Sequence, residues 1–173
     1  MGAERTEPRV LRLRGAAELS FVDRALDALD GLWAASPELP ARERTLFALA
    51  VAETLTNIVE HGSGGGAARA GSGEPEVEIR LSVELDLGAV PRELRATIRD
   101  SAAPAAIDWG SVAMPGGEAE SGRGLALARS VLDEFRHEPA AASAPGAEAP
   151  RGNTWVLGKR LGPEPDSAGD PGS

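Results

Sequence analysis

The spacing of apolar residues along the chain predicts three helices. In residues 17–33 and 40–61, apolar side chains recur every three or four positions, which is the spacing that lines one face of a helix. Residues 124–135 show the same spacing over a shorter stretch. The second helix carries an apolar stripe through Leu46, Leu49 and Ala50 and ends at the Gly-rich run that begins at Gly62. The segment 62–75 has no apolar periodicity, and we expect a mobile loop there.

Alternation of apolar and polar residues predicts strands elsewhere in the chain. Residues 77–87 alternate without interruption and residues 94–100 follow a short turn, so the two stretches favour a hairpin. Further strands are expected at 9–14, 136–140 and 153–161. Strand, helix, helix, two strands, helix and two strands is an order typical of α+β proteins. It predicts a two-layer α/β sandwich in which a mixed or antiparallel sheet carries its helices on one face.

Length and composition narrow the class of protein. A chain of 173 residues suits one domain, which we place at residues 9–161, with disordered ends at 1–8 and 162–173. The net charge of −9 argues against a nucleic-acid partner, because binding to a phosphate backbone needs clustered Lys and Arg. The sequence has no Cys, which excludes disulfides and thiolate metal sites. No stretch is apolar enough for a signal peptide or a membrane span, so we expect a cytoplasmic protein.

Two polar residues interrupt the apolar face of the second helix. Glu53 and Asn57 lie four positions apart and therefore on the same side of that helix. Polar groups in such a place are costly without a partner. A carboxylate beside an amide oxygen suits Mg²⁺, or a general base that works next to a metal ligand. An exposed helix edge that passes through Glu53 would produce the same spacing.

Asp100 ends the second strand of the predicted hairpin and enters a turn of small residues at 101–104. A carboxylate in that position can accept a hydrogen bond from an exocyclic amino group, such as that of adenine. An Asp that caps a turn gives the same pattern and is frequent. Asp100 is therefore a candidate only in combination with other features.

The third helix opens with Gly122, Arg123, Gly124 and Leu125. Gly allows the backbone to approach a ligand closely, and a helix N-terminus offers free N–H groups to phosphate oxygens. Arg123 adds a positive charge that can face such oxygens. A plain Gly-rich start of a helix is the alternative interpretation of this segment.

The combination of these features favours a nucleotide site. A polar helix face, an Asp at a strand end and a Gly-Arg-Gly helix start follow one another in the chain, and a small polar turn with Thr154 precedes the last strand. Independent accidents would have to coincide to produce this order. We therefore interpret the features together, with Thr154 included among the candidate binding residues.

At these residues the sequence resembles the GHKL superfamily of ATP-binding domains, and within it the anti-sigma-factor serine/threonine kinases. LAVAETLTNIVEHG at 49–62 resembles the N box of that family, IRDSAAP at 98–104 its first glycine box, and SGRGLAL at 121–127 its second glycine box. The resemblance implies a Bergerat-type ATP-binding fold over residues 19–161. It also implies ATP and Mg²⁺ as ligands and the segment 105–121 as a lid over the nucleotide.

The resemblance assigns roles to individual residues. It implies that Asn57 holds Mg²⁺, that Glu53 acts as the general base or orients the nucleophile, and that Asp100 recognises adenine. The segment from Gly122 to Leu125 would wrap the triphosphate. Ala102 stands where the family has Gly, and an Ala is strained there if the backbone needs a positive φ.

The resemblance also implies a function. Its members transfer phosphate from ATP to a Ser or Thr of a small antagonist protein, an anti-anti-sigma protein of the STAS type, or sequester a sigma factor. A homodimer is implied as a candidate assembly. The alternative is a non-catalytic module in which ATP sets the affinity for a partner. A detached histidine-kinase domain is disfavoured, because no dimerising helix with a phosphoacceptor His precedes the N box, and a scaffold that binds no nucleotide is the last alternative.

Overall fold

The computed structural model describes residues 7–62, 77–107, 109, 112, 123–141 and 152–162. Most of the expected loop 62–75 and most of the expected lid 105–121 lie outside these residues. The same holds for residues 1–6 and 163–173 of the ends that we expected to be disordered, and for Gly122.

Within the described residues, helices and strands follow one another in the order that the sequence predicts. A strand and two helices come first, a hairpin follows, and a helix and two strands complete the chain. The bounds are β1 Arg9–Ala16, α1 Leu19–Ala34, α2 Ala41–Gly62, β2 Glu78–Asp86, β3 Glu93–Asp100, α3 Arg123–Val131, β4 Glu134–Pro139 and β5 Asn153–Arg160.

The last helix is shorter than its apolar spacing predicts. We expected it to reach Phe135, but α3 ends at Val131 and Phe135 belongs to β4. The backbone N–H of Asp133 donates to the carbonyl of Gly158 in β5, so the chain has already joined the sheet at that point. The spacing of Phe135 fits a helix face as well as the inner face of a strand, and pairing with β5 decides between the two.

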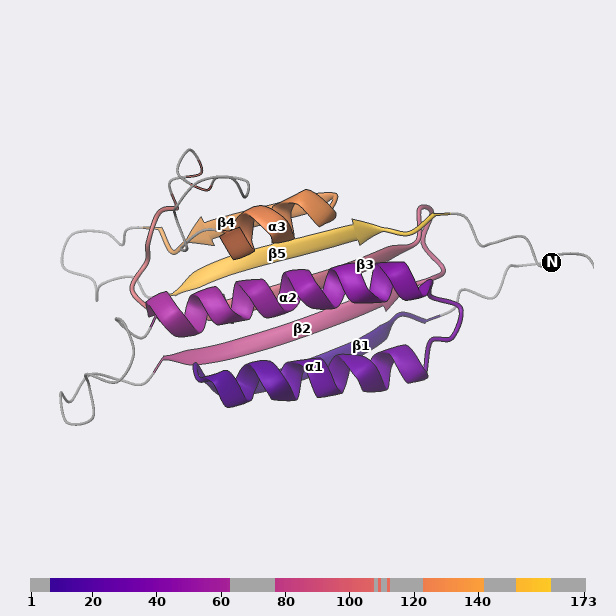
Figure 1. The fold of residues 1–173 in the computed structure, drawn as a ribbon, viewed down its shortest axis with the longest axis horizontal. Coiled ribbons are helices and arrows are strands. Elements are labelled where there is room, and N and C mark those ends of the chain that lie inside the picture. The colour runs from indigo at the N-terminus through magenta and orange to yellow at the C-terminus, as the bar shows by residue number, and fades with distance from the viewer. Residues whose placement is uncertain are drawn as a thin grey trace, which may run out of the picture.

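The strands of the described residues form one antiparallel sheet in the order β1-β2-β3-β5-β4. The helices all cover the same face of this sheet (Figure 1), with α1 against β1, α2 against β3 and β5, and α3 against β4. The predicted α+β sandwich with helices on one face is therefore confirmed. Of the two sheet types left open by the sequence, the antiparallel one is found.

Alternation along the strands separates a buried face from a charged one. The side chains of β2 and β3 that point toward the helices are aliphatic and buried: Ile79, Leu81, Val83, Leu85, Leu94, Ala96 and Ile98. Their removal from water is the main favourable contribution to folding. The opposite face carries charged residues that form ion pairs: Glu78 pairs across strands with Arg14 of β1 and along β2 with Arg80.

One end of the sheet gathers segments that lie far apart in the sequence. β3 ends there at Asp100, and β5 begins there because Asp100 is paired with Asn153. β4 ends at the same place, since Pro139 is also paired with Asn153. The C-terminal end of α2 and the first turn of α3 lie at this end too (Figure 1). The strand that ends at Asp100 and the helix that carries Arg123 and Gly124 in its first turn therefore reach the same end of the molecule.

Candidate nucleotide site

Asp100 accepts three N–H hydrogen bonds. Its Oδ1 accepts from the backbone N–H of Ala102 at 3.0 Å and from the side-chain amide of Asn153 at 2.9 Å, and its Oδ2 accepts from the indole N–H of Trp155 at 3.1 Å. The residue is only 7% exposed. Because a carboxylate offers about four acceptor sites, the described residues leave one for a further donor. An exocyclic amino group such as that of adenine is a donor of the required kind.

Asn153 fixes the turn after Asp100 to the sheet. Its amide N–H₂ donates to Asp100, and its amide oxygen accepts from the backbone N–H of Ala105 at 3.1 Å. Ala102 is buried in the same turn, and its carbonyl accepts from the N–H of Gly152 at 2.7 Å. Both backbone groups of Ala102 are therefore bonded, and the start of the predicted lid is held against the start of β5.

Gly152 allows two backbones to approach each other beside Asp100. Its φ is +98°, a backbone conformation that residues other than Gly rarely adopt. A Cβ at this position would also lie 2.5 Å from the carbonyl oxygen of Asp100. The glycine before the last strand is thus required for the geometry of the cluster around Asp100.

Glu53 lies against the first turn of α3. A Cβ at Gly124 would overlap Oε2 of Glu53, so Gly leaves room for this carboxylate in its present position. The N-terminal turn of a helix carries a partial positive charge, which favours carboxylate and phosphate groups near it. The contact therefore places a carboxylate beside a helix end that is suited to hold phosphate.

Asn57 lies one turn beyond Glu53 on α2 and, like Glu53, is half-buried. The fully buried side of α2 differs from the stripe expected from the sequence, since Leu46 and Leu49 are only half-buried. The fully buried side is made by Phe47, Ala50, Val51 and Leu55. Glu53 and Asn57 thus lie on the flank of α2, and Glu53 faces α3 rather than the core.

Two further residues of the predicted phosphate-binding segment belong to α3. Arg123 is its exposed first residue. Leu125 is buried in the core cluster and anchors the helix to the rest of the molecule. Leu125 thus anchors the first turn of α3 in the core, and Glu53 contacts the same turn at Gly124.

Thr154 lies away from this cluster. It alternates along β5 with Asn153 and Trp155, both of which face Asp100, so Thr154 lies on the opposite face of the sheet. The structure brings Glu53 to Gly124 and does not bring Thr154 to either the Asp100 cluster or α3.

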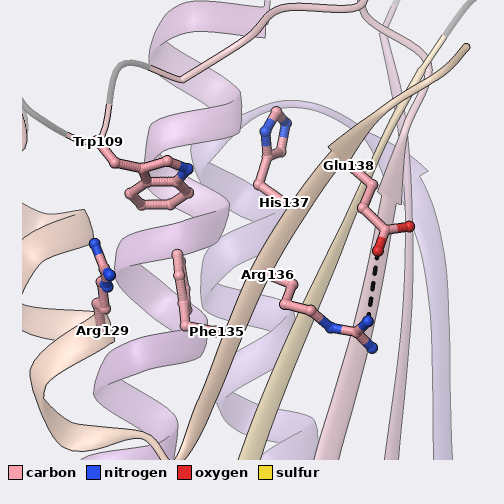
Figure 2. A pocket seen from close by; sticks show the side chains of 6 residues that line it. All are labelled: Trp109, Arg129, Phe135, Arg136, His137 and Glu138. Carbon is pink, nitrogen blue, oxygen red and sulfur yellow. Dashed lines mark ion pairs between the residues drawn. The ribbon is translucent and has the colours of Figure 1, made fainter.

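A hollow of about 280 Å³ opens beside β4. Trp109, from the predicted lid, packs edge-on against Phe135 with ring centroids 5.7 Å apart, and the guanidinium of Arg129 lies 5.4 Å from the Trp109 ring (Figure 2). Arg136 and Glu138 form an ion pair on the other side of the strand (Figure 2). Trp109, one of the few described residues of the predicted lid, thus contacts both β4 and α3.

His137 connects this hollow to the cluster around Asp100. Its ring centroid lies 4.1 Å from that of Trp155, and the two rings are tilted by 47°. Burial lowers the pKa of His137 below the usual value of 6.5, while the charge of Asp100 and an interaction with Asn153 act in the opposite direction. The neutral form of His137 is therefore favoured beside the cluster.

Sequence reasoning missed three residues of this cluster, namely Asn153, Trp155 and His137. Alternation along β5 offers two faces, and only the pairing of Asn153 with Asp100 shows which one belongs to the site. His137 lies directly across from Trp155, a relationship that follows from the β4–β5 register. Alternation thus indicates that Asn153 and Trp155 share one face of β5, but the sequence alone does not show which face of β5 belongs to the site.

Magnesium fits the residues at this site. The described residues contain no group of three or more His, Cys, Asp or Glu that could hold a metal by itself. Mg²⁺ is usually bound through one or two protein oxygens together with water and substrate phosphates. The amide oxygen of Asn57, one turn from the Glu53 carboxylate, offers such a ligand.

None of the helices in the described residues combines the length and apolarity that crossing a membrane requires.

Comparison with known protein families adds independent information. Residues 16–144 match the family described as "Histidine kinase-like ATPase domain". This stretch contains Glu53, Asn57, Asp100 and the start of α3, whereas β5 with Trp155 lies beyond it. The sequence matches no curated protein. Since the matched stretch covers most of the chain and contains the geometry described above, the protein belongs to the histidine kinase-like ATPase domain family of the GHKL superfamily, whose domains bind ATP.

Proposed function

We propose that this protein is a serine/threonine protein kinase of the anti-sigma-factor type, which phosphorylates a small antagonist protein of the STAS type. The contact between Glu53 and Gly124 is the observation that supports this proposal most. It places a carboxylate at the helix end where the phosphates of ATP would bind. Transfer of phosphate to a hydroxyl needs a group that accepts the hydroxyl proton at that place.

In this proposal each residue has one task. Asp100 accepts a hydrogen bond from the amino group of adenine with its fourth acceptor site, and the first turn of α3 faces the phosphates. The amide oxygen of Asn57 would hold Mg²⁺, which supplies neutralisation of the phosphate charge. Glu53 accepts the proton of the Ser or Thr hydroxyl as that oxygen bonds to the γ-phosphorus and ADP leaves.

Sequestration of a sigma factor is the second output that we propose for the same protein. Bound ATP would influence both phosphate transfer and sigma-factor binding. The structural link is Asn153, which bonds both to Asp100 and to the backbone of Ala105, where the predicted lid begins. A nucleotide that contacts Asp100 would therefore also act, through Asn153, on the backbone at Ala105.

A transfer assay tests the kinase proposal. The protein is incubated with Mg²⁺, ATP labelled at the γ-phosphate and candidate STAS proteins, with Glu53→Gln as the control. We expect label on a Ser or Thr of the partner that survives acid, unlike the acid-labile phosphohistidine of a histidine kinase, and no label with the variant. Bound ATP without any transfer would contradict the kinase proposal and leave an ATP-dependent binding module.

A further inference from the structure

Trp155 is the only aromatic residue among the described residues whose side chain donates a hydrogen bond to Asp100. It lies in β5, is 3% exposed, and reaches Oδ2 of the carboxylate across 55 positions of the sequence. A buried indole N–H needs a partner, and here the partner is the residue assigned to the base of the nucleotide. The contact is therefore part of the proposed adenine site and not only of the core.

The indole is held in one orientation by two rings that project from the same face of β4. Phe135 lies 6.2 Å from Trp155 between centroids with an interplanar angle of 61°, and His137 lies at 4.1 Å. The paired residue on the other neighbouring strand is Ile98, which is fully buried. With these neighbours the indole cannot turn its N–H away from Asp100 without repacking the sheet edge.

The carboxylate would turn if this bond were absent. The terminal torsion of Asp is broad, so bonds to a single oxygen leave the other oxygen free to move. Asn153 and Ala102 both bond to Oδ1, and Trp155 bonds to Oδ2. Trp155 is thus the residue among those described that fixes the second oxygen and, with it, the direction of the remaining acceptor site.

We propose that Trp155 is a positioning residue that aims the free acceptor site of Asp100 and thereby makes the site selective for purines with a 6-amino group. The inference rests on the proposed role of Asp100 toward adenine. It goes beyond the family match, because that match ends before β5. A nucleotide whose base lacks the amino group gains nothing from this arrangement, so Trp155 acts on ATP and not on such an analogue.

The test compares ATP with purine riboside 5′-triphosphate, which lacks only the 6-amino group, by calorimetric titration of the full chain. Trp155→Phe removes the N–H and keeps a buried aromatic ring. Without the indole N–H, the carboxylate of Asp100 no longer points its acceptor site at the 6-amino group of adenine. Loss of this hydrogen bond between ATP and a charged group predicts about tenfold weaker binding of ATP. Binding of purine riboside triphosphate should stay within about twofold, because its contacts do not involve this acceptor site. The ratio of the two affinities is therefore the readout.

Trp33→Phe is the matched control, since Trp33 is also buried, at 6%, but packs on Phe47 between α1 and α2. This variant should leave the ratio unchanged. Equal weakening of both nucleotides by Trp155→Phe would show a merely structural role and overturn the proposal. Unchanged ATP affinity in that variant would overturn it as well. Failure of the wild-type protein to bind either nucleotide would instead overturn the proposed function on which the inference rests.

A measurement on the wild-type protein covers the case in which Trp155→Phe does not fold. The chain contains three Trp, so its ¹H–¹⁵N spectrum has three indole signals, which Trp33→Phe and Trp109→Phe assign by elimination. We expect the Trp155 indole signal to shift with ATP and clearly less with purine riboside triphosphate. Equal shifts with both nucleotides, or none with ATP, would contradict the proposal.

Discussion

The carboxylate of Glu53 occupies the space that a side chain at Gly124 would need. The contact joins the middle of α2 to the first turn of α3, two elements that are separated in the sequence by a hairpin and a long loop. It gives the glycine of the predicted phosphate-binding segment a task besides conformational freedom. The glycine makes room for the group that we propose as the base.

Gly124→Ala should therefore separate stability from activity. The added methyl group meets the mobile end of the Glu53 side chain, which can swing away, so we expect a change in unfolding free energy below about 1 kcal/mol. Phosphate transfer should fall by about 100-fold or more, because the proposed base leaves its place. Urea unfolding and the labelled-ATP assay measure the two quantities.

Gly31→Ala is the control for this prediction, because a Cβ at Gly31 in α1 meets nothing within 4 Å. It should stabilise the helix by about 0.5–1 kcal/mol and leave transfer unchanged. If Gly124→Ala unfolded the protein instead, the contact with Glu53 would be a packing requirement and the explanation by a displaced base would be wrong.

Glu53 and Asn57 should differ in what their loss affects. Glu53→Gln keeps the shape of the side chain, so we expect the affinity for ATP to change by less than a few-fold while transfer falls by about 100-fold or more. Asn57→Ala should weaken binding of ATP with Mg²⁺ and have little effect on ADP without Mg²⁺. Calorimetric titrations of the two variants, with and without Mg²⁺, check this division. Equal loss of binding and transfer in Glu53→Gln would make Glu53 a structural residue.

The sequence predicts the helices and strands that carry these residues better than it predicts the contacts between them. The helical spacing of Glu53 and Asn57 is a local property, and so is the alternation that gives the strands and the α+β sandwich. The pairing of Asp100 with Asn153 depends instead on how a long segment between them closes, which no local pattern encodes. For that reason the sequence points to Thr154, whereas in the structure Asn153 and Trp155 of β5 face Asp100.

The same limit explains the other differences. Phe135 continues the apolar spacing of α3, yet pairing with β5 makes it part of β4. The fully buried side of α2 is displaced from the predicted stripe because the packing of α1 and the sheet against it selects one side of a broadly apolar helix. Tertiary contacts decide in both cases between patterns that the sequence alone permits.

Gly152→Ala should destabilise the fold. Its φ of +98° is unfavourable for any L side chain, and the new Cβ would approach the carbonyl oxygen of Asp100 to 2.5 Å. Backbone strain of this kind costs about 1–3 kcal/mol, and we expect a loss of at least that size in urea unfolding. Gly162→Ala, where a Cβ meets nothing within 4 Å, should have almost no effect. Similar stabilities for the two variants would show that the backbones do not meet at Gly152.

His137 should make stability depend on pH on the acid side of neutrality. Because burial lowers its pKa below 6.5, the unfolded chain binds the proton more readily than the folded one. The contribution of His137 is fully present above pH 6.5 and is lost as the pH falls through the lower pKa of the folded state.

Unfolding free energies of the wild type and of His137→Gln between pH 5 and 8 test this prediction. The variant should lose part of the decline seen in the wild type below about pH 6.5, while the decline caused by carboxylates remains in both. Identical pH profiles would mean that His137 titrates alike in the folded and unfolded chains.

The central claim is that ATP binds at the end of the sheet where Asp100 accepts its three N–H bonds. Calorimetric titration with ATP and Mg²⁺ tests it most directly, with the wild type and Asp100→Asn measured side by side. We predict one ATP per chain for the wild type and at least about tenfold weaker binding for the variant, since an amide group presents a donor where the site needs an acceptor. Equal affinities for the two proteins, or no binding of ATP by the wild type, would contradict the account.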